Sequence, residues 1–391
     1  MRKGWEYKKL GEVCTLISDG SHNPPKGIDH SLYRMISSQN VFDDNLQITE
    51  DNVRYITESD HLCENKRTKL QKDVVLLTIV GTIGRSCVLK GNEGCLTLQR
   101  SVAALHPSDQ IMPRYLMHCL IGNRHTLNQE AHGIAQKGIY LKQLSSLSIP
   151  LPPKSTQLAI VSELDKINEL IRLKKEQLKD FDNLAQSLFY EMFGDPVENE
   201  MGWEVKTFGE IGSVERGAGI SKKDFVKEGL PCIHYGQLHT ILGPRTIKHF
   251  TSIPHNLLPK YKIAHTGDLV MAITSEDVEG SCKSTVWLGD YDIIVGSDAA
   301  IFHHKQDGTF LSYYTMTKAF FNEKAKYAKG FKVTHISAKE IEKIPVYLPP
   351  LPLQRLFAQR IEQIEREKSE VQKSIQDLET LLASRMQYWF E

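Results

Sequence analysis

The chain has 391 residues, 48 basic and 48 acidic side chains, and seven cysteines without a C-x-x-C pair. This length predicts two to three domains, and the zero net charge argues against a protein that coats nucleic acid by bulk charge, although a local basic surface stays possible. The odd, scattered cysteines argue against a disulfide framework or a zinc site, and the absence of a long apolar stretch argues against a membrane protein. We therefore expect a cytoplasmic chain with free thiols.

The chain opens on a segment that is repeated in its second half. GWEYKKLGEV at 4–13 returns as GWEVKTFGEI at 202–211. A longer segment at 133–153 returns at 330–350, and both copies end in Leu-Pro-Pro. Solenoid repeats run to 20–50 residues, so units of about 200 residues are whole domains. The sequence therefore predicts two copies of one unit, each a globular part followed by a helix.

The globular part of each copy mixes short strands with helices. DVVLLTIVG and DLVMAIT are apolar runs bounded by turn residues, as buried strands are. CLTLQRSVAAL and IIVGSDAAIF predict further strands, whereas PRYLMHCLIGNRH and TFLSYYTMTKAFFNEKAK have helical spacing. The predicted fold class is α+β.

A proline pair closes each globular part and precedes a long helix. Proline disfavours helix at the residue before it and cannot continue a strand ladder, so these pairs are stops. Ser155 or Thr156 is predicted to cap the first helix, and Pro352 to lie in the first turn of the second. The predicted boundaries are 1–154 for the first globular part, 155–195 for its helix, 196–351 for the second globular part and 352–391 for its helix.

Both helices carry apolar residues at heptad spacing. The rows in the first helix are Ile160, Ile167, Phe181 and Leu188, with Lys174 in the gap, and Leu164, Ile171, Leu178 and Ala185. The rows in the second are Phe357, Ile364, Val371 and Leu378, and Ile361, Ile375, Leu382 and Trp389, with Lys368 in the gap. Sustained heptads predict a coiled coil, and two separate surface helices are the alternative. We predict an antiparallel pair, which relates the two copies by a pseudo-twofold axis.

No catalytic, cofactor-binding or metal site is predicted. HNPPKG at 22–27 resembles the Asn-Pro-Pro-aromatic motif of amino-methyltransferases, but Lys26 stands in the aromatic place and an Asn-Pro turn is the better interpretation. The sequence contains neither a P-loop nor H-E-x-x-H. His234 and His239, and the adjacent His303 and His304, lack a cysteine or carboxylate cluster in register.

The duplicated motifs resemble one family, the specificity subunits of type I restriction–modification enzymes. They are the Leu-Pro-Pro…Gln segments at 151–157 and 348–354, the two opening segments, and MFGDP at 192–196. The resemblance covers essentially the whole chain. It implies two target recognition domains, each reading one half of a bipartite, asymmetric sequence in double-stranded DNA, and two helices that set the length of the unread gap.

The resemblance also implies what the chain lacks and which partners it has. It implies no catalytic residue and no cofactor on this chain. Two methyltransferase subunits would bind it and methylate adenine with S-adenosylmethionine, and ATP-driven restriction subunits are further partners. Much of the phosphate binding would then come from the methyltransferases, which agrees with a net charge of zero.

Polar loop residues are the candidates for reading base edges, which are contacted by Arg, Lys, Asn, Gln, Ser and Thr. The candidates in the first half are Lys26, Arg34, Ser37, Gln39, Asn40, Thr82 and Arg85. Those in the second half are Arg216, His234, Tyr235, Gln237, Ser275, Lys283, Lys332 and His335. Gln157 and Gln354, at the two helix starts, either cap the turn or bind a methyltransferase subunit.

Two other classes of protein fit parts of the pattern. A duplicated adaptor could organise two protein partners without touching bases, and it would show no salt-dependent preference for a DNA sequence. A methyltransferase fused to a recognition part would methylate DNA without partners.

Overall fold

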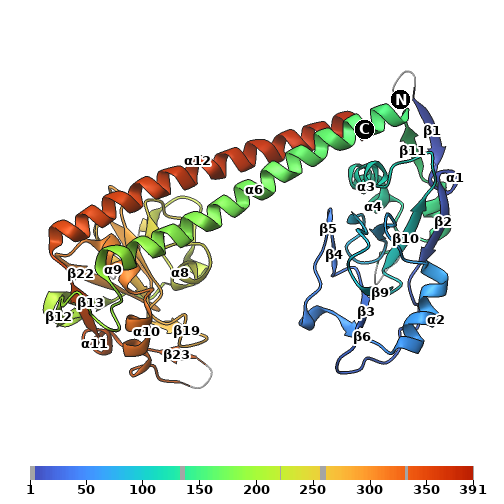
Figure 1. The fold of residues 1–391 in the computed structure, drawn as a ribbon. Helices are drawn as coiled ribbons and strands as arrows, with labels where there is room; N and C mark the ends of the chain where they lie inside the picture. Colours follow the sequence, from blue (N-terminus) through green and yellow to red (C-terminus); the bar gives the residue numbers. More distant parts are fainter. Residues whose placement is uncertain (1–4, 133–136, 221, 256–260, 331–332, 391) are drawn as a thin grey trace. The chain divides into compact units, whose positions relative to one another are not determined.

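The computed structural model describes residues 5–132, 137–220, 222–255, 261–330 and 333–390. They belong to two compact units, which are considered separately (Figure 1). Unit 1 is formed by Met1–Lys175 and Lys373–Glu391, and unit 2 by Glu176–Gln372. Each unit thus contains one globular part and one half of each long helix. Within the described ranges, no helix combines the length and apolar composition that crossing a membrane requires.

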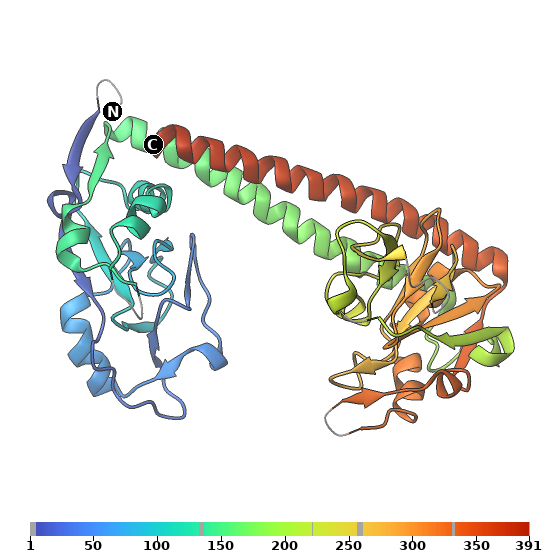
Figure 2. The ribbon, with the colours of Figure 1, turned by 180° about the vertical axis from the view of Figure 1, so that it is seen from behind.

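Unit 1 contains a four-stranded antiparallel sheet in the order β2-β10-β7-β8 and a smaller sheet in which β3 pairs with β6 and β9. Strands β1 and β11 pair separately, with the dark-blue β1 beside the green β11 (Figure 2). The strands are β1 Glu6–Lys9, β2 Cys14–Asp19, β3 Tyr33–Ile36, β4 Val41–Phe42, β5 Asn45–Leu46, β6 Arg54–Tyr55, β7 Val75–Thr78, β8 Ser86–Val88, β9 Cys95–Leu98, β10 Val102–Pro107 and β11 Ser148–Leu151. The helices are α1 Leu10–Val13, α2 Glu58–Thr68, α3 Pro113–Gly122, α4 Arg124–Gln129 and α5 Leu141–Ser146.

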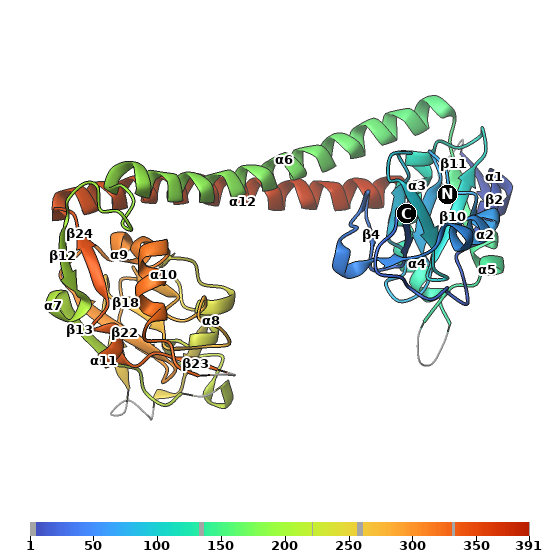
Figure 3. The same cartoon turned by 60° about the horizontal axis from the view of Figure 1, so that its bottom comes forward.

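Unit 2 repeats these strand pairings and extends both sheets. Its main sheet has the order β13-β22-β18-β20-β15, with β15 added, and in its second sheet β14 pairs with β16 and β21, with β17 added beside β21. Strand β12 pairs with β24, which leads into the second long helix (Figure 3). The strands are β12 Glu204–Thr207, β13 Gly212–Arg216, β14 Leu230–Ile233, β15 Arg245–Thr246, β16 Thr251–Ile253, β17 Lys262–Ala264, β18 Leu269–Ala272, β19 Thr274–Ser275, β20 Ser284–Trp287, β21 Ile293–Val295, β22 Ala299–His304, β23 Thr334–His335 and β24 Pro345–Leu348. The helices are α7 Phe208–Ile211, α8 Tyr235–Thr240, α9 Gly308–Tyr314, α10 Lys318–Ala325 and α11 Ala338–Ile341. The predicted α+β class and internal repeat are confirmed.

The central strands β7 and β18 are buried on both faces, which explains their continuous apolar sequences. Successive side chains of a strand point to opposite faces of its sheet. Val75 and Leu77 accordingly enter the core that contains α3, whereas Leu76 enters a second core on the other face. In unit 2, Met271 and Val270 divide in the same way between two cores.

The two long helices pair in opposite directions, as the heptads predict. They are α6 Lys154–Phe193 and α12 Leu351–Phe390, 40 residues each. In unit 1 the first half of α6 packs against the last half of α12, and in unit 2 the last half of α6 packs against the first half of α12. Helix α12 therefore leaves the globular part of unit 2 and ends on that of unit 1, where Phe390 packs against Tyr115.

Ion pairs flank the apolar seam in both units. In unit 1, Glu163 of α6 accepts hydrogen bonds from Arg385 and, at 2.9 Å, from the indole nitrogen of Trp389. The bond from Arg385, opposed by partial burial, lowers the pKa of Glu163. In unit 2, the Lys368 ammonium lies 2.7 Å from the Asp182 carboxylate of the facing helix. The lysine that interrupts the heptads of α12 thus makes a charged contact across the seam.

The start of α6 differs from the prediction. The helix begins at Lys154, so Ser155 and Thr156 lie within its first turn and neither is the cap. The backbone carbonyl of Pro153 instead accepts the first helical hydrogen bonds, at 2.9 Å from the Thr156 nitrogen. Pro352 lies in the first turn of α12, as predicted.

His304, the last residue of β22, is expected to make unit 2 sensitive to acid. Its Nδ1 lies 3.1 Å from the Gln306 carbonyl oxygen, and its Nε2 is buried with no hydrogen-bond partner in the described part of the chain. Burial, the main cause, lowers the pKa of His304 from 6.5 to about 4. Below pH 6.5 the unfolded chain binds a proton that the folded chain excludes. The free energy of unfolding should therefore fall by roughly 3 kcal/mol between pH 6.5 and pH 4 because of this group.

Urea unfolding at several pH values checks this expectation. His304→Gln should flatten the loss of unfolding free energy over that pH range, while the same substitution at the exposed His125 should leave the slope as it is in the wild type. Equal slopes for all three proteins would show that His304 does not resist protonation.

Candidate nucleic-acid interface

Gln157 joins the start of α6 to the globular part of unit 1. The side chain is 1% exposed. Its carbonyl oxygen accepts a hydrogen bond from the Met112 backbone nitrogen at 2.8 Å, and its amide donates to the backbone oxygens of Gln110 and Pro152, both at 3.0 Å. Met112 directly precedes α3, so one glutamine connects the proline stop, α3 and α6.

Gln354 makes the same connection in unit 2, where it is 0% exposed. Its carbonyl oxygen accepts from the backbone nitrogen of Asp307, which precedes α9, at 3.0 Å. Its amide donates to the Pro349 carbonyl at 2.8 Å and to the Gln306 side chain at 3.0 Å. The observed role of both glutamines is this internal joint, and a role in binding a methyltransferase subunit stays a prediction.

Gln157→Ala should lower the free energy of unfolding by about 3 kcal/mol, because it leaves one buried N–H and two carbonyls without partners. Gln354→Ala should cost a similar amount. The exposed Gln372 of α12 is a matched control, and its alanine variant should change stability by less than about 0.5 kcal/mol. Urea unfolding measures the three values. A Gln157→Ala chain of wild-type stability that no longer bound a methyltransferase would instead support the partner-binding role.

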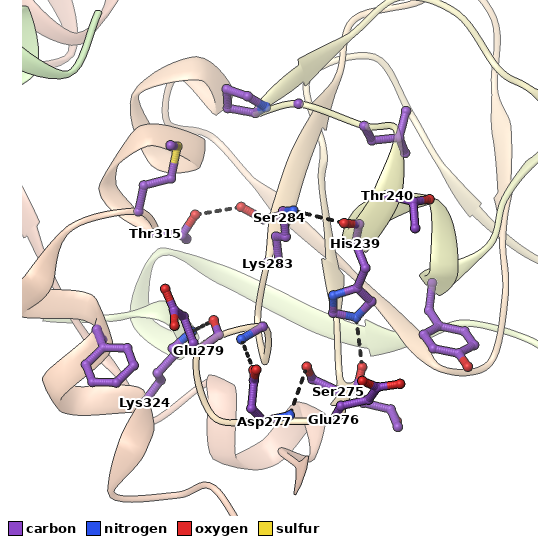
Figure 4. A pocket seen from close by; sticks show the side chains of 18 of the residues that line it. His239, Thr240, Ser275, Glu276, Asp277, Glu279, Lys283, Ser284, Thr315 and Lys324 are labelled. Atoms are coloured by element: carbon purple, nitrogen blue, oxygen red, sulfur yellow. Dashed lines mark hydrogen bonds between the residues drawn. The ribbon is translucent and has the colours of Figure 1, made fainter. Parts of the chain in front are cut away.

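A hollow of about 1220 Å³ opens in unit 2, between α8, the loop after β18, the start of α10 and the last part of α6. Figure 4 shows His239, Ser275 and Lys283 close together in its wall. His239 Nε2 lies 3.1 Å from the Thr274 carbonyl oxygen, and the Lys283 ammonium donates to the His239 carbonyl at 3.2 Å. These bonds fix α8 against the loop after β18.

The lining of the hollow carries charges of both signs. Lys283, Lys318 and Lys324 contribute ammonium groups, while Glu276, Asp277 and Glu279 contribute carboxylates. Carboxylates repel phosphate, so this lining is unsuited to a simple phosphate site. Base edges offer both amine donors and oxygen or nitrogen acceptors, so they match a lining of mixed charge.

The structure brings four of the predicted residues of unit 2 to this hollow. Tyr235, Ser275 and Lys283 line it, and His335 Nδ1 lies 3.3 Å from the hydroxyl of Thr274, another lining residue. Arg216 is exposed at the end of β13, where it donates to the Ser297 carbonyl at 2.8 Å. Lys332 lies outside the described residues.

His234 and Gln237 have structural contacts at the start of α8 instead. The Gln237 side-chain oxygen accepts from the His234 backbone nitrogen at 2.9 Å, and His234 Nδ1 accepts from the Gly236 nitrogen at 3.2 Å. Both side chains are buried. Burial, together with the charge of Lys222, lowers the pKa of His234. These two side chains support Tyr235 rather than being exposed to a ligand.

In unit 1, two loops with predicted residues lie side by side. The Thr82 hydroxyl is 3.5 Å from the Ser38 carbonyl oxygen, between Ser37 and Gln39. The Arg85 guanidinium lies 4.7 Å from the centroid of the Phe42 ring. The loop that carries Ser37 and Gln39 therefore lies beside Thr82, and Arg85 packs on Phe42.

The other three candidates of unit 1 are placed differently. Asn40 is 0% exposed. Its side-chain nitrogen donates to the Asn52 carbonyl at 3.0 Å, and its side-chain oxygen accepts from the Ser37 nitrogen at 2.8 Å. All of its amide groups serve the loop, so none is available for a base. Arg34 donates to the Glu93 carbonyl, and Lys26 is exposed in the loop before β3.

The loops after β7 and β18 start and end on equivalent hydrogen bonds. The Thr78 nitrogen donates to the Arg85 carbonyl in unit 1, and the Ala272 nitrogen donates to the Lys283 carbonyl in unit 2, both at 2.9 Å. Six residues, 79–84, lie between the first pair and ten, 273–282, between the second. We call these segments the first and second inner loops.

Further backbone bonds show that the inner loops occupy the same place in the two copies. Ile79 accepts from the Ile139 nitrogen at 2.9 Å, and Ile273 accepts from the Ile336 nitrogen at 3.0 Å. The scaffold is therefore repeated, while the two loops differ in length and in side chains.

Sequence reasoning missed several polar residues of the hollow, including His239, Glu276, Asp277 and Lys324. The predicted strand DLVMAIT ends just before Glu276 and Asp277 and places them in a loop after a buried strand, which was the available signal. The contribution of α10 had no local signal, because Lys324 meets the second inner loop across 43 residues of sequence.

Comparison with known proteins gives consistent matches across the chain. The family model of the type I restriction modification DNA specificity domain matches residues 2–180 and 200–380. The specificity subunit of the type I restriction enzyme MjaVIII from Methanocaldococcus jannaschii is 23% identical over 339 residues, which cover 80% of this chain and 78% of that one. The MjaIX specificity subunit of the same organism is 23% identical over 313 residues, covering 73% and 69%.

Two solved structures share the fold. The S subunit of a type I restriction–modification system from M. genitalium aligns with a TM-score of 0.53 at 14% identity, over 98% of this chain and 95% of that one. A chain from a structure of the assembly and conformational transition of the type I R-M system aligns with a TM-score of 0.59 at 17% identity, over 100% and 98%.

Proposed function

Because the chain belongs to the type I restriction modification DNA specificity family, it serves sequence-specific DNA recognition in such a system, and we propose that each copy reads one half of a bipartite, asymmetric DNA sequence. The globular parts of units 1 and 2 are then recognition domains 1 and 2. In each, the inner loop and the polar residues beside it contact base edges. The residues proposed for this role are Ser37, Gln39, Thr82 and Arg85 in domain 1 and Tyr235 and Lys283 in domain 2, whereas Ser275 lines the hollow with a buried side chain.

One observation carries this proposal: the same scaffold occurs twice with different inner loops. Equivalent backbone bonds hold the two loops, but the first has six residues and the second ten, with several carboxylates. Two identical readers would favour a symmetric DNA site, since protein symmetry is matched by symmetry of the operator. Two different readers on one scaffold favour two unrelated half-sites.

We further propose that α6 and α12 set the length of the gap between the half-sites. Each helix is a continuous element of 40 residues, about 60 Å long at 1.5 Å per residue. The apolar seam and the ion pairs that flank it support a fixed length. A stiff pair of this kind restricts which spacing of half-sites can be read at the same time.

The proposed partners are two methyltransferase subunits, with restriction subunits as further members of the complex. The related chain from a structure of type I R-M complex assembly supports a role within an assembly. S-adenosylmethionine and ATP are expected on those partners, and adenine methylation or restriction would follow from the sequence that this chain selects. The duplicated scaffold offers two equivalent places for a pair of identical partners.

Reconstitution with the cognate methyltransferase tests the proposal. Labelled S-adenosylmethionine and a duplex library with randomised positions should give methylation of one bipartite sequence. Binding should weaken steeply with salt, because phosphate contacts release counterions. The chain alone should give no product. Methylation without the partner would make the chain an enzyme, and binding without sequence preference would favour an adaptor.

A further inference from the structure

The first inner loop is held by an arginine from α4. The Arg124 guanidinium donates two hydrogen bonds to the Gly84 carbonyl, at 3.0 and 3.1 Å. Its aliphatic stem packs on Gly84, where an added Cβ would lie 2.8 Å from the Arg124 Cγ. Gly84 also has a φ of 90°, a conformation that side chains disfavour. The glycine therefore admits the arginine to the loop backbone.

The same arginine reaches a second loop of domain 1. It forms an ion pair with Asp43, in the turn between β4 and β5, with its terminal nitrogen 2.7 Å from one carboxylate oxygen. Phe42, the neighbour of Asp43, carries the Arg85 guanidinium on its ring. Arg124 thus fixes the first inner loop and also the turn beside Phe42, the ring on which Arg85 packs.

The second inner loop is held by a lysine from α10. Lys324 is 4% exposed, and its ammonium donates to the backbone carbonyls of Glu279, at 2.7 Å, and Ser281. The ammonium also lies 5.4 Å from the centroid of the Phe321 ring. Figure 4 shows Lys324 reaching the loop at Glu279. A buried ammonium is costly unless it is well bonded, so this contact is specific.

Helices α4 and α10 are equivalent elements, since each is the second helix after the equivalent strands β10 and β22. Both present a cation to main-chain oxygens of the inner loop. A bond to a backbone carbonyl does not depend on the loop side chains. At positions other than Gly84, the loop can therefore carry different side chains, and the second loop can have four more residues, without losing this support.

We propose that Arg124 and Lys324 are positioning residues that hold the base-reading loops of domains 1 and 2 through their backbones. This inference rests on the proposed function. It adds that the two inner loops determine specificity and that each depends on one cation from the following helices. Each residue should then affect the half-site of its own domain alone.

The test uses the full chain, reconstituted with its methyltransferase subunits, on a duplex library randomised at every position of the site. Arg124→Met should relax the base preference about ten-fold or more in one half-site. Lys324→Met should do so in the other. The unaffected half-site reports in each case that the complex is assembled and folded.

Conservative variants and salt dependence separate positioning from other roles. Arg124→Lys and Lys324→Arg should retain most of the preference, because each keeps a cationic donor. Gly84→Ala should reproduce the effect of Arg124→Met, because the added methyl group would displace the Arg124 side chain from the loop backbone. The slope of binding against salt should stay unchanged, because a cation bound to carbonyls releases no phosphate counterion.

The outcomes that overturn the inference are distinct from failure of the proposed function. Unchanged preferences in both half-sites for Arg124→Met and Lys324→Met, or for Gly84→Ala, would exclude the positioning role. A salt slope reduced by about one unit would assign the cations to phosphates instead. A wild-type complex that showed no bipartite preference would overturn the proposed function itself.

Discussion

Replacing residues 1–150 with the first domain of another specificity subunit is expected to change one half of the recognised sequence and to leave the other half as it was. The reason is that each domain has its own sheet, its own inner loop and its own cation from α4 or α10. Several base contacts change together, each worth about 1–3 kcal/mol, so the old half-site should be lost entirely. Sequencing of methylated DNA from the reconstituted complex measures the change.

The contacts of domain 1 with the long helices determine how this exchange must be made. Arg114 of α3 binds Asp165 of α6 through two nitrogens, at 2.6 and 2.7 Å, and Trp5 stacks on Trp389 at 6.2 Å between ring centroids. An incoming domain therefore needs residues equivalent to Arg114 and Trp5 in order to pack on α6 and α12 of this chain. The reciprocal exchange of residues 196–350 is the matched control. A change in both half-sites after either exchange would contradict independent reading.

Inserting one heptad into each long helix should lengthen the gap and leave both half-sites unchanged. Seven residues add about 10 Å of helix, so the gap should grow by at most about three base pairs. The insertions belong where the two units divide, after Lys175 in α6 and before Lys373 in α12. Because the helices are antiparallel, paired insertions at these points keep the seam of each unit in register.

The methylated sequence again measures the result. Insertion into α6 alone is the informative control, because it shifts one half of α6 by seven residues against α12. The ion pairs Glu163–Arg385 and Asp182–Lys368 cannot then both form, and methylation should weaken at every site. Replacing seven residues near Lys175 with another heptad of the same pattern should leave the gap unaltered. A gap of wild-type length after the paired insertion would contradict the role of the helices as a spacer.

Much of the fold was predictable, because the signals are local and repeated. The heptad rows of α6 and α12 and the apolar runs of β7 and β18 follow directly from periodicity. The start of α6 was not, since side-chain chemistry suggested Ser155 or Thr156 as the cap, whereas both residues lie inside a helix that begins at Lys154. The proline pair sets the start of α6, because the Pro153 carbonyl accepts the first helical hydrogen bonds.

The site was predictable only in part, because the direction of a polar side chain depends on tertiary contacts. Asn40 and Thr82 are both polar loop residues. The buried amide of Asn40 is hydrogen-bonded within its own loop, whereas Thr82 is exposed. Gln157 and Gln354 hold equivalent places in the sequence and make equivalent contacts in the structure. Their bonds to Met112 and Asp307 cross more than 40 residues of sequence, so their structural role could not be read locally.

The packing of Phe390 on Tyr115 and Gly122 bears on how the protein is made. Domain 1 emerges from the ribosome before the last turn of α12 has been synthesised, so part of its apolar core is at first uncovered. Its folding can be completed only once the last turn of α12 has been synthesised. A chain that lacked the last turn of α12 would therefore lose core contacts in the domain that is synthesised first.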